Sequence, residues 1–169
     1  QQTLRPAQYC GFKFFNVYGP NEYYKGSMAS VIFHTFNKIK ETGEMGLFKS
    51  YRPDYADGQQ LRDFVYVKDI CKVVKFMIEH PDVNGLFNLG TGTARSFYDL
   101  AKATFDALGL EPNIKFVEMP ETLRKKYQYY TQANMEKLRA AGYHEAFYTL
   151  EEGCKDYVTN YLAQDYKTY

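Results

Sequence analysis

GFKFFNVYG (residues 11–19) decides the fold, because it predicts a buried strand that ends in a tight turn. Its aromatic and β-branched residues run up to Gly19 and Pro20, which is typical of a strand followed by a turn. A helix is expected next, over residues 27–40, with Gly43 just past its end as a left-handed cap. The apolar positions of this helix fall at helical spacing: Met28, Val31, Ile32 and Phe36.

Strand and helix then alternate along the chain. RDFVYVKD (62–69) predicts a strand over 64–67 and a helix that is capped by Asp69 and ends at Pro81. GLFNLGTG (85–92) predicts a strand with a glycine turn, and SFYD (96–99) predicts a capping box that opens a helix through Leu108. Further along we expect a strand over 114–120, a helix over 131–143 that closes on Gly142, and a last helix opened by Thr149 and Glu152. This alternation indicates an α/β architecture. The second helix is expected to carry one apolar face, made of Ile70, Val73, Val74, Met77 and Ile78.

Composition narrows the class of partner. The chain has 169 residues, about one domain, and its 21 basic and 20 acidic residues leave a formal charge of only +1, which gives no field for gathering nucleic acid or an anionic membrane. No apolar run is long enough to span a bilayer, and the first residues lack a hydrophobic signal core. Three widely spaced cysteines favour buried thiols in a reducing cytosol. We therefore expect a soluble, cytoplasmic protein with small-molecule partners.

Several chemistries are excluded by motif. GTGTAR (90–95) has Arg95 where a dinucleotide fingerprint needs its third glycine, so Gly90 and Gly92 are interpreted as a strand-to-helix turn. There is no Walker turn and no GxSxG elbow. The three histidines are isolated and no CxxC spacing exists, so no metal site is predicted.

Five segments, in order, carry a resemblance to a known family: FNVYGP, KGSMAS, RDFVYVKD, FNLGTG and YTQANMEKLRAAGY. Together they resemble the C-terminal half of the ADP-L-glycero-D-manno-heptose 6-epimerases, and they cover nearly the whole chain. NVYGP and RDFVYVxD indicate only the extended short-chain dehydrogenase/reductase superfamily, whereas KGSMAS and the region from Tyr127 to Tyr143 single out the heptose epimerases.

The resemblance implies a fold and a division of the protein. We expect the C-terminal part of a Rossmann-type NAD(P)-binding fold plus a small α/β substrate-binding lobe, with residues 1–169 as a C-terminal fragment. The family's glycine-rich NADP-binding part and its Tyr-x-x-x-Lys pair are expected upstream, outside this chain. The nearest local match, Tyr9 to Lys13, lies inside the predicted strand and is not taken for that pair. Alone, this chain is expected to be inactive.

The family's reaction gives Lys25 a role. NADP takes hydride from carbon six of the heptose, a transient ketone forms, and hydride returns to the other face, so that two acid/base groups are needed. The resemblance assigns one role to the upstream tyrosine and the other to Lys25, which also lies near the cofactor. Tyr23, Tyr24 and Met28 are expected to surround its amine and keep it from water, as a lysine base requires. From the residues alone, an exposed lysine pairing with Glu22 is the alternative.

Other site residues also come from the resemblance. Asn16 would contact substrate and Val17 would lie beside the nicotinamide. Ser27 and His34 would hydrogen-bond the nucleotide sugar, Arg62 would face the pyrophosphate with its planar donor fork, and Tyr127 would close the site. The residues alone allow ordinary alternatives: Ser27 as a helix cap, His34 on the surface, Arg62 paired with Asp63, and Tyr127 in the core.

The loop between Phe48 and Arg62 is longer than the family pattern. Phe48, Lys49, Ser50 and Tyr51 match the segment that contacts adenosine, and the additional residues would reshape the nucleotide pocket.

Other functions compete with the heptose epimerase. On the same scaffold these are a UDP-sugar 4-epimerase or a nucleotide-sugar dehydratase, neither of which needs a lysine at position 25. From other classes they are a non-catalytic nucleotide-sugar-binding module and a protein-interaction domain. The resemblance further implies a homo-oligomer whose product serves lipopolysaccharide core synthesis.

Overall fold

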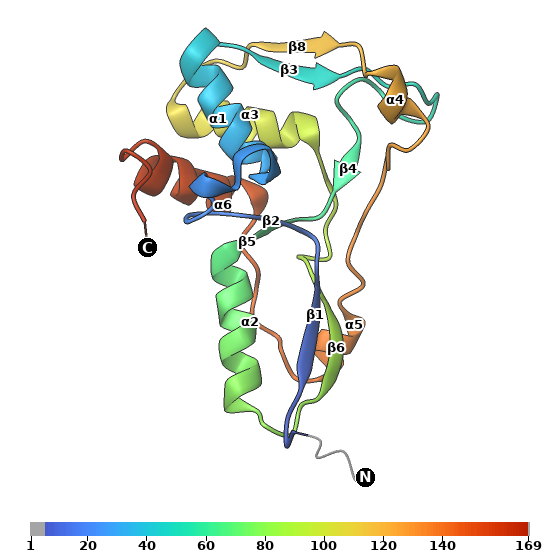
Figure 1. The fold of residues 1–169 in the computed structure, drawn as a ribbon, viewed down its shortest axis with the longest axis vertical. Coiled ribbons are helices and arrows are strands. Elements are labelled where there is room, and N and C mark those ends of the chain that lie inside the picture. The colour runs from blue at the N-terminus through green and yellow to red at the C-terminus, as the bar shows by residue number, and fades with distance from the viewer. Residues whose placement is uncertain (1–5, 169) are drawn as a thin grey trace.

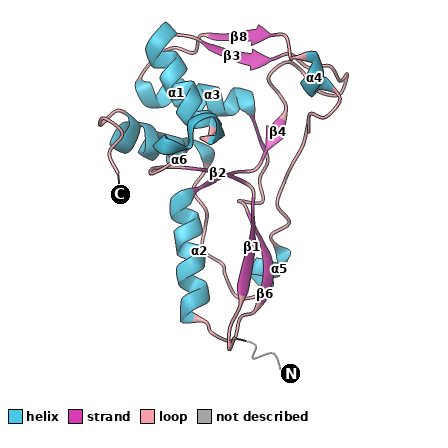
Figure 2. Cartoon of the chain, in the orientation of Figure 1, coloured by secondary structure: helices cyan, strands magenta, loops and turns pink. Residues whose placement is uncertain are grey.

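A computed structural model describes residues 6–168 and shows two groups of elements joined by short strands (Figure 1). In the lower group, strands β1 (Cys10–Phe14) and β6 (Gly85–Leu89) pair in parallel beside helices α2 (Val67–Glu79) and α5 (Glu136–Ala140). In the upper group, helices α1 (Val31–Thr42), α3 (Phe97–Leu108) and α6 (Leu150–Tyr157) lie beside the parallel pair β3 (Met45–Phe48) and β8 (Ile114–Val117). Figure 2 shows this mixture of helices and strands, which confirms the predicted α/β class.

The first predicted strand is divided in two. Strand β1 ends at Phe14, and β2 (Asn16–Tyr18) pairs in parallel with β5 (Phe64–Tyr66). The division lies at Phe15, whose backbone N–H donates to Leu89 O at 3.0 Å, while the N–H of Asn16 donates to Asp63 O at 3.0 Å. One continuous apolar run therefore serves two strand pairs, and the prediction of a single strand was wrong in this respect.

Helix α2 covers the lower strands with only part of the predicted face. Ile70, Val73 and Met77 are buried in a cluster with Phe87 and Leu89 of β6. The other two predicted members of the face, Val74 and Ile78, are exposed, because each lies one position further round the helix. Asp69 does not cap α2: Tyr66 is the N-cap, and the buried Asp69 carboxylate accepts hydrogen bonds from Tyr148 N and Lys72 Nζ.

Helix α1 begins later than predicted. A 3₁₀ helix over Tyr23–Met28 (η1), here called the Lys25 segment, precedes it, and Ser30 rather than Ser27 is the N-cap. The Ser30 hydroxyl accepts from Phe33 N at 3.2 Å. At the other end Gly43 has φ of 71°, which confirms the predicted left-handed cap.

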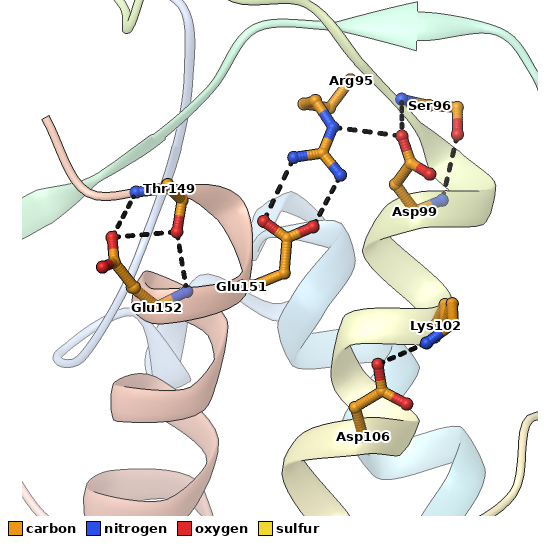
Figure 3. Close-up of polar contacts among 8 residues, drawn as sticks. All are labelled: Arg95, Ser96, Asp99, Lys102, Asp106, Thr149, Glu151 and Glu152. Atoms are coloured by element: carbon orange, nitrogen blue, oxygen red, sulfur yellow. Dashed lines mark hydrogen bonds and ion pairs between the residues drawn. The ribbon is translucent and has the colours of Figure 1, made fainter.

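Helices α3 and α6 begin as predicted. Both capping boxes are present, Ser96 with Asp99 and Thr149 with Glu152 (Figure 3). Arg95 of β7 (Arg95–Ser96), which pairs with β4 (Leu61–Arg62), joins the two helices by donating to Asp99 of α3 and Glu151 of α6. A π-helical turn, η2 (Val158–Leu162), extends α6. Where α3 and α6 meet, Thr104 Oγ1 and Cys154 Sγ lie 3.5 Å apart, and burial raises the pKa of this thiol to about 12.

The helix predicted over 131–143 is short. Only α5 (Glu136–Ala140) is helical, and α4 (Glu121–Arg124) is a single turn before it. Ala133 N donates instead to the Asp63 carboxylate at 3.0 Å, which holds this stretch extended. The expectation of buried thiols is confirmed for Cys154 and wrong for Cys71, which is exposed. Between residues 6 and 168, no helix has the length and apolar character that crossing a bilayer requires.

Candidate functional site

The glycine turn after β6 does not offer a phosphate cradle. The buried Asp63 carboxylate accepts from Thr91 N at 2.7 Å, Gly92 N at 2.9 Å and Ala133 N at 3.0 Å. A Cβ on Gly90 would lie 2.6 Å from Asp63 Oδ2, so glycine is required there by packing. The amides that a phosphate would use at this turn are thus occupied by the Asp63 carboxylate.

A cavity of about 300 Å³ lies between α1, β3 and the start of α3. Its walls are mostly apolar, and Phe48 meets Tyr127 edge-on with ring centroids 6.2 Å apart. Both residues were predicted to contact substrate, and the structure brings them together. A cavity with aromatic walls suits a planar ring. The lining residues are Val31, Met45, Gly46, Leu47, Phe48, Gln60, Phe97 and Tyr127.

Arg62 contacts two walls of this cavity. Its guanidinium carbon lies 5.6 Å from the Phe97 ring centroid and 5.3 Å from that of Tyr127. Only 9% of the residue is exposed, and its N–H groups donate to two backbone carbonyls, Leu61 O at 2.8 Å and Gln128 O. Among the described residues no carboxylate forms an ion pair with Arg62. The alternative prediction that Arg62 pairs with Asp63 is therefore wrong.

Burial sets the electrostatics of this pair. It lowers the pKa of Arg62, which nevertheless stays protonated at neutral pH. Burial also raises the pKa of Tyr127, and the charge of Arg62 partly offsets that rise. A buried cation that has no carboxylate partner among the described residues, beside an aromatic cavity, suits an anionic group attached to a ring.

Residues 49–51 directly follow β3, and the chain here runs beside α4 (Figure 1). Lys49 Nζ is 2.7 Å from Glu118 Oε1, and the Tyr51 hydroxyl donates to the same carboxylate. The Arg124 guanidinium covers the Tyr51 ring at 3.9 Å. Ser50 N donates to Asp57 Oδ1 at 2.7 Å. The long loop is therefore fastened to the chain around Glu118, and its predicted binding residues have internal partners.

The Lys25 segment lies elsewhere and is open to water. Lys25 and Ser27 are exposed, as are Tyr24 (85%) and Met28 (82%). Tyr23 packs away from Lys25, against Phe33 and Tyr166. The expectation that neighbouring side chains surround the Lys25 amine is therefore wrong for this chain, because no residue of η1 is buried.

The remaining predicted residues flank this segment. Asn16 is exposed at the start of β2, and Val17 is half-buried opposite Val65. His34 is exposed on α1, with its ring edge-on to Phe33. In the part of the chain that the structure describes, no hydrogen bond, ion pair or ring contact joins this group to Arg62 or Tyr127. The predicted residues thus fall mainly into two clusters, a cavity of about 300 Å³ with aromatic walls and a strand end with an exposed lysine.

Sequence reasoning missed three residues of these clusters. Gln60 is buried in the cavity wall and donates to Phe48 O and Lys49 O. Phe97 faces Arg62, and its place directly after the Ser96 cap was the available signal. Glu118 joins Lys49 and Tyr51, and nothing in its local sequence pointed to that role.

Comparison with known proteins gives consistent matches. The family model described as NAD dependent epimerase/dehydratase family matches residues 4–90. An ADP-L-glycero-D-manno-heptose-6-epimerase of Fusobacterium nucleatum is 52% identical over 171 residues, which cover 98% of this chain and 52% of that protein. The chain spans about half the length of the curated relatives it matches.

Solved structures agree on the fold. The crystal structure of the Helicobacter pylori ADP-L-glycero-D-manno-heptose-6-epimerase superposes with a TM-score of 0.72 at 29% identity, covering 90% of this chain and 44% of that one. A UDP-glucose 4-epimerase from Thermotoga maritima, solved with UDP-glucose, gives a TM-score of 0.71 at 23% identity, covering 95% and 47%. The latter shows a shared fold alone, so this α/β chain is part of a Rossmann-type epimerase/dehydratase fold.

Proposed function

The chain belongs to the NAD dependent epimerase/dehydratase family, and we propose that the protein containing it is an ADP-L-glycero-D-manno-heptose 6-epimerase. The observation that supports the proposal is Arg62, a buried guanidinium that has no carboxylate partner among residues 6–168 and that lies beside the rings of Phe97 and Tyr127, two residues of the cavity wall. Such a site suits the pyrophosphate of a nucleotide sugar. The name of the 52% identical relative supports the choice of ADP-heptose.

Each residue then has a task. Arg62 binds pyrophosphate, Phe48 and Tyr127 hold the base, and the segment 49–51 contacts adenosine. Asn16, Ser27 and His34 donate or accept hydrogen bonds at the sugar, from elements beside the exposed Lys25. Lys25 moves a proton at the oxygen on carbon six, and bound substrate would exclude water from its amine.

NADP is proposed as the cofactor, and it supplies a hydride acceptor and donor at carbon six when it is bound. Val17 and Lys25 would contribute contacts to it. Because the Asp63 carboxylate occupies the amides of the glycine turn after β6, we assign the dinucleotide phosphates to a part of the protein other than this chain.

Residues 1–169 then make up a C-terminal fragment, with the last Rossmann strands and the substrate-binding lobe. Alone, this fragment lacks the cofactor site and is inactive. The whole enzyme is a cytoplasmic homo-oligomer that works on nucleotide sugars, and its product serves lipopolysaccharide core synthesis.

The test uses the whole protein. Incubated with NADP and ADP-D-glycero-D-manno-heptose, it should produce the carbon-six epimer, observed by NMR, and Lys25→Ala should abolish turnover while leaving substrate binding intact. Lys38→Ala, at an exposed lysine of α1 that pairs with Glu41, is the matched control and should keep full activity. Conversion of a UDP-sugar instead, or binding without turnover in the unmodified protein, would contradict the proposal and favour the 4-epimerase, dehydratase or binding-module alternatives.

A further inference from the structure

Glu22 is a buried carboxylate that pairs with no cation among residues 6–168. Only 4% of the residue is exposed, and none of the ion pairs among the described residues includes it. Its oxygens instead accept from Ser30 N at 2.7 Å, Ser30 Oγ at 2.7 Å and the Tyr157 hydroxyl at 2.9 Å, with Gly19 N more distant at 3.5 Å. The alternative for Lys25, an exposed lysine paired with Glu22, is therefore confirmed in its exposure and wrong in its pairing.

The surroundings explain why the charge is tolerated. Ser30 is the N-cap of α1, so the carboxylate lies at the positive end of that helix dipole. The Ser30 hydroxyl accepts from Phe33 N while it donates to Glu22. Burial, and next the charge of Glu22, raise the pKa of Tyr157, which keeps that hydroxyl a donor at neutral pH. Charge-assisted hydrogen bonds thus replace a counter-ion.

The partners of Glu22 lie on three sides of the Lys25 segment. Gly19 follows β2, Ser30 opens α1, and Tyr157 ends α6. The backbone oxygen of Glu22 also accepts from Lys25 N at 3.0 Å. One side chain therefore fastens both ends of the segment and fixes them to a helix that is distant in sequence.

One other anchor holds the segment: Tyr23 packs against Phe33 and Tyr166, and its hydroxyl donates to Lys167 O at 2.6 Å. From Tyr24 to Met28 the residues are exposed. No residue of η1 is buried, and Gly26, with φ of 54°, interrupts its helical backbone. We propose that Glu22 is a positioning residue for Lys25, which holds the exposed lysine at a fixed place relative to β2 and α1. This inference rests on the proposed function, in which the Lys25 amine transfers a proton.

The kinetic test uses the whole enzyme and Glu22→Gln. An amide cannot accept from every donor around the carboxylate, so the segment should loosen, and kcat for ADP-heptose epimerisation should fall about tenfold or more with KM within about twofold, because a misplacement of about 1 Å can cost about 100-fold in rate. Tyr157→Phe, which keeps the ring in the core, should lower kcat in the same direction, and it carries the test if Glu22→Gln fails to fold.

Asp69→Asn is the matched control. Asp69 is also a buried carboxylate, but its partners are Tyr148 N and Lys72 Nζ, and among the described residues it makes no hydrogen bond to Ser30 or to the Lys25 segment. This variant should lose stability and keep kcat. An unchanged kcat in Glu22→Gln, or an equal fall in Asp69→Asn, overturns the inference.

A second measurement needs no substrate. Hydrogen exchange at the amides of Lys25 and Ala29, which donate to Glu22 O and Gly26 O, should be about tenfold faster in Glu22→Gln than in Asp69→Asn. If the unmodified enzyme does not turn over ADP-heptose, the proposed function fails and this exchange still decides about Glu22. Equal exchange in the two variants overturns the positioning role.

Discussion

Arg62 is the residue whose chemistry is least replaceable. Its guanidinium lies within cation–π distance of the Phe97 and Tyr127 rings while two N–H groups donate to backbone carbonyls, so these contacts hold its orientation before any ligand arrives. Lysine would keep the charge but would lose both the stacking and the fork. The strength of the site therefore depends on shape as well as on charge.

For Arg62→Lys in the whole enzyme we expect KM for the nucleotide sugar to rise roughly 10- to 100-fold, since a hydrogen bond to a charged group is worth about 1.5–3 kcal/mol. Steady-state kinetics measure this. Arg139→Lys is the control, because Arg139 also stacks on two aromatic rings and donates to backbone carbonyls, away from the cavity. An equal rise in both variants would argue against a pyrophosphate contact.

At the scale of elements, the packing of α6 requires a glycine at position 153. A Cβ on Gly153 would lie 2.2 Å from the Tyr18 hydroxyl and 3.2 Å from Tyr66 Cβ, so the helix approaches β2 and β5 as closely as glycine allows. Gly153→Ala should therefore destabilise the fold by about 1–3 kcal/mol, although alanine is the better helix former. Urea unfolding midpoints check this, with exposed Lys155→Ala in the same helix expected to stay within about 0.5 kcal/mol. A stabilised Gly153→Ala would contradict the close packing.

The Arg95 contact between α3 and α6 predicts a pH dependence. Its hydrogen bond holds the pKa of Glu151 below the ordinary value. A lowered pKa in the folded state contributes stability above the unfolded pKa, and this stability is lost as the pH falls through the folded one. Arg95→Gln should therefore reduce the loss of unfolding free energy between about pH 5 and pH 3, measured by urea unfolding. The difference should stay below about 1 kcal/mol because the pair is partly exposed. Lys102→Gln, which breaks another α3 ion pair, should leave the Arg95 contribution in place.

At this scale, the features that the sequence predicted best depend on residues close together in the chain. The capping boxes of α3 and α6 involve residues three apart, so Ser96 with Asp99 and Thr149 with Glu152 were readable directly. The extended chain around Ala133 depends on Asp63, which is distant in the sequence, and was missed. The start of α1 was missed although the Ser30 cap on Phe33 N is local, because Ser27 and Met28 continued the apparent helical pattern upstream. In the site, the resemblance supplied Arg62 and Tyr127, but only the fold could bring Phe97 and Gln60 beside them.

At the scale of the whole molecule, the lower group of elements leaves apolar side chains of its strands and helix exposed to solvent. In the lower group, Phe14 of β1, Leu86 of β6 and Ile78 of α2 are exposed, beside a sheet of only two strands. Open strand edges with apolar side chains favour association. The chain is therefore better covered within a larger structure than alone.

We expect residues 1–169, expressed alone, to self-associate in a concentration-dependent way. Sedimentation velocity measures this, and Leu86→Lys should reduce the association. Leu110→Lys, at an exposed leucine after α3 (49% against 64% for Leu86), is the control and should have little effect. Monodisperse behaviour of the unmodified chain up to about 100 μM would refute the expectation, since surfaces of this kind associate at micromolar to millimolar concentration.

The reactivity of the buried Cys154 thiol between α3 and α6 also reports on the opening of this helix pair. The thiolate is the reactive form, and a pKa raised to about 12 leaves almost none of it at neutral pH while Cys154 is covered. A thiol reagent should consume exposed Cys71 first and half-buried Cys10 next, and should reach Cys154 only when the two helices part. The rate of that slow reaction therefore measures how often the helix pair opens, and the natural sequence needs no added label for the measurement.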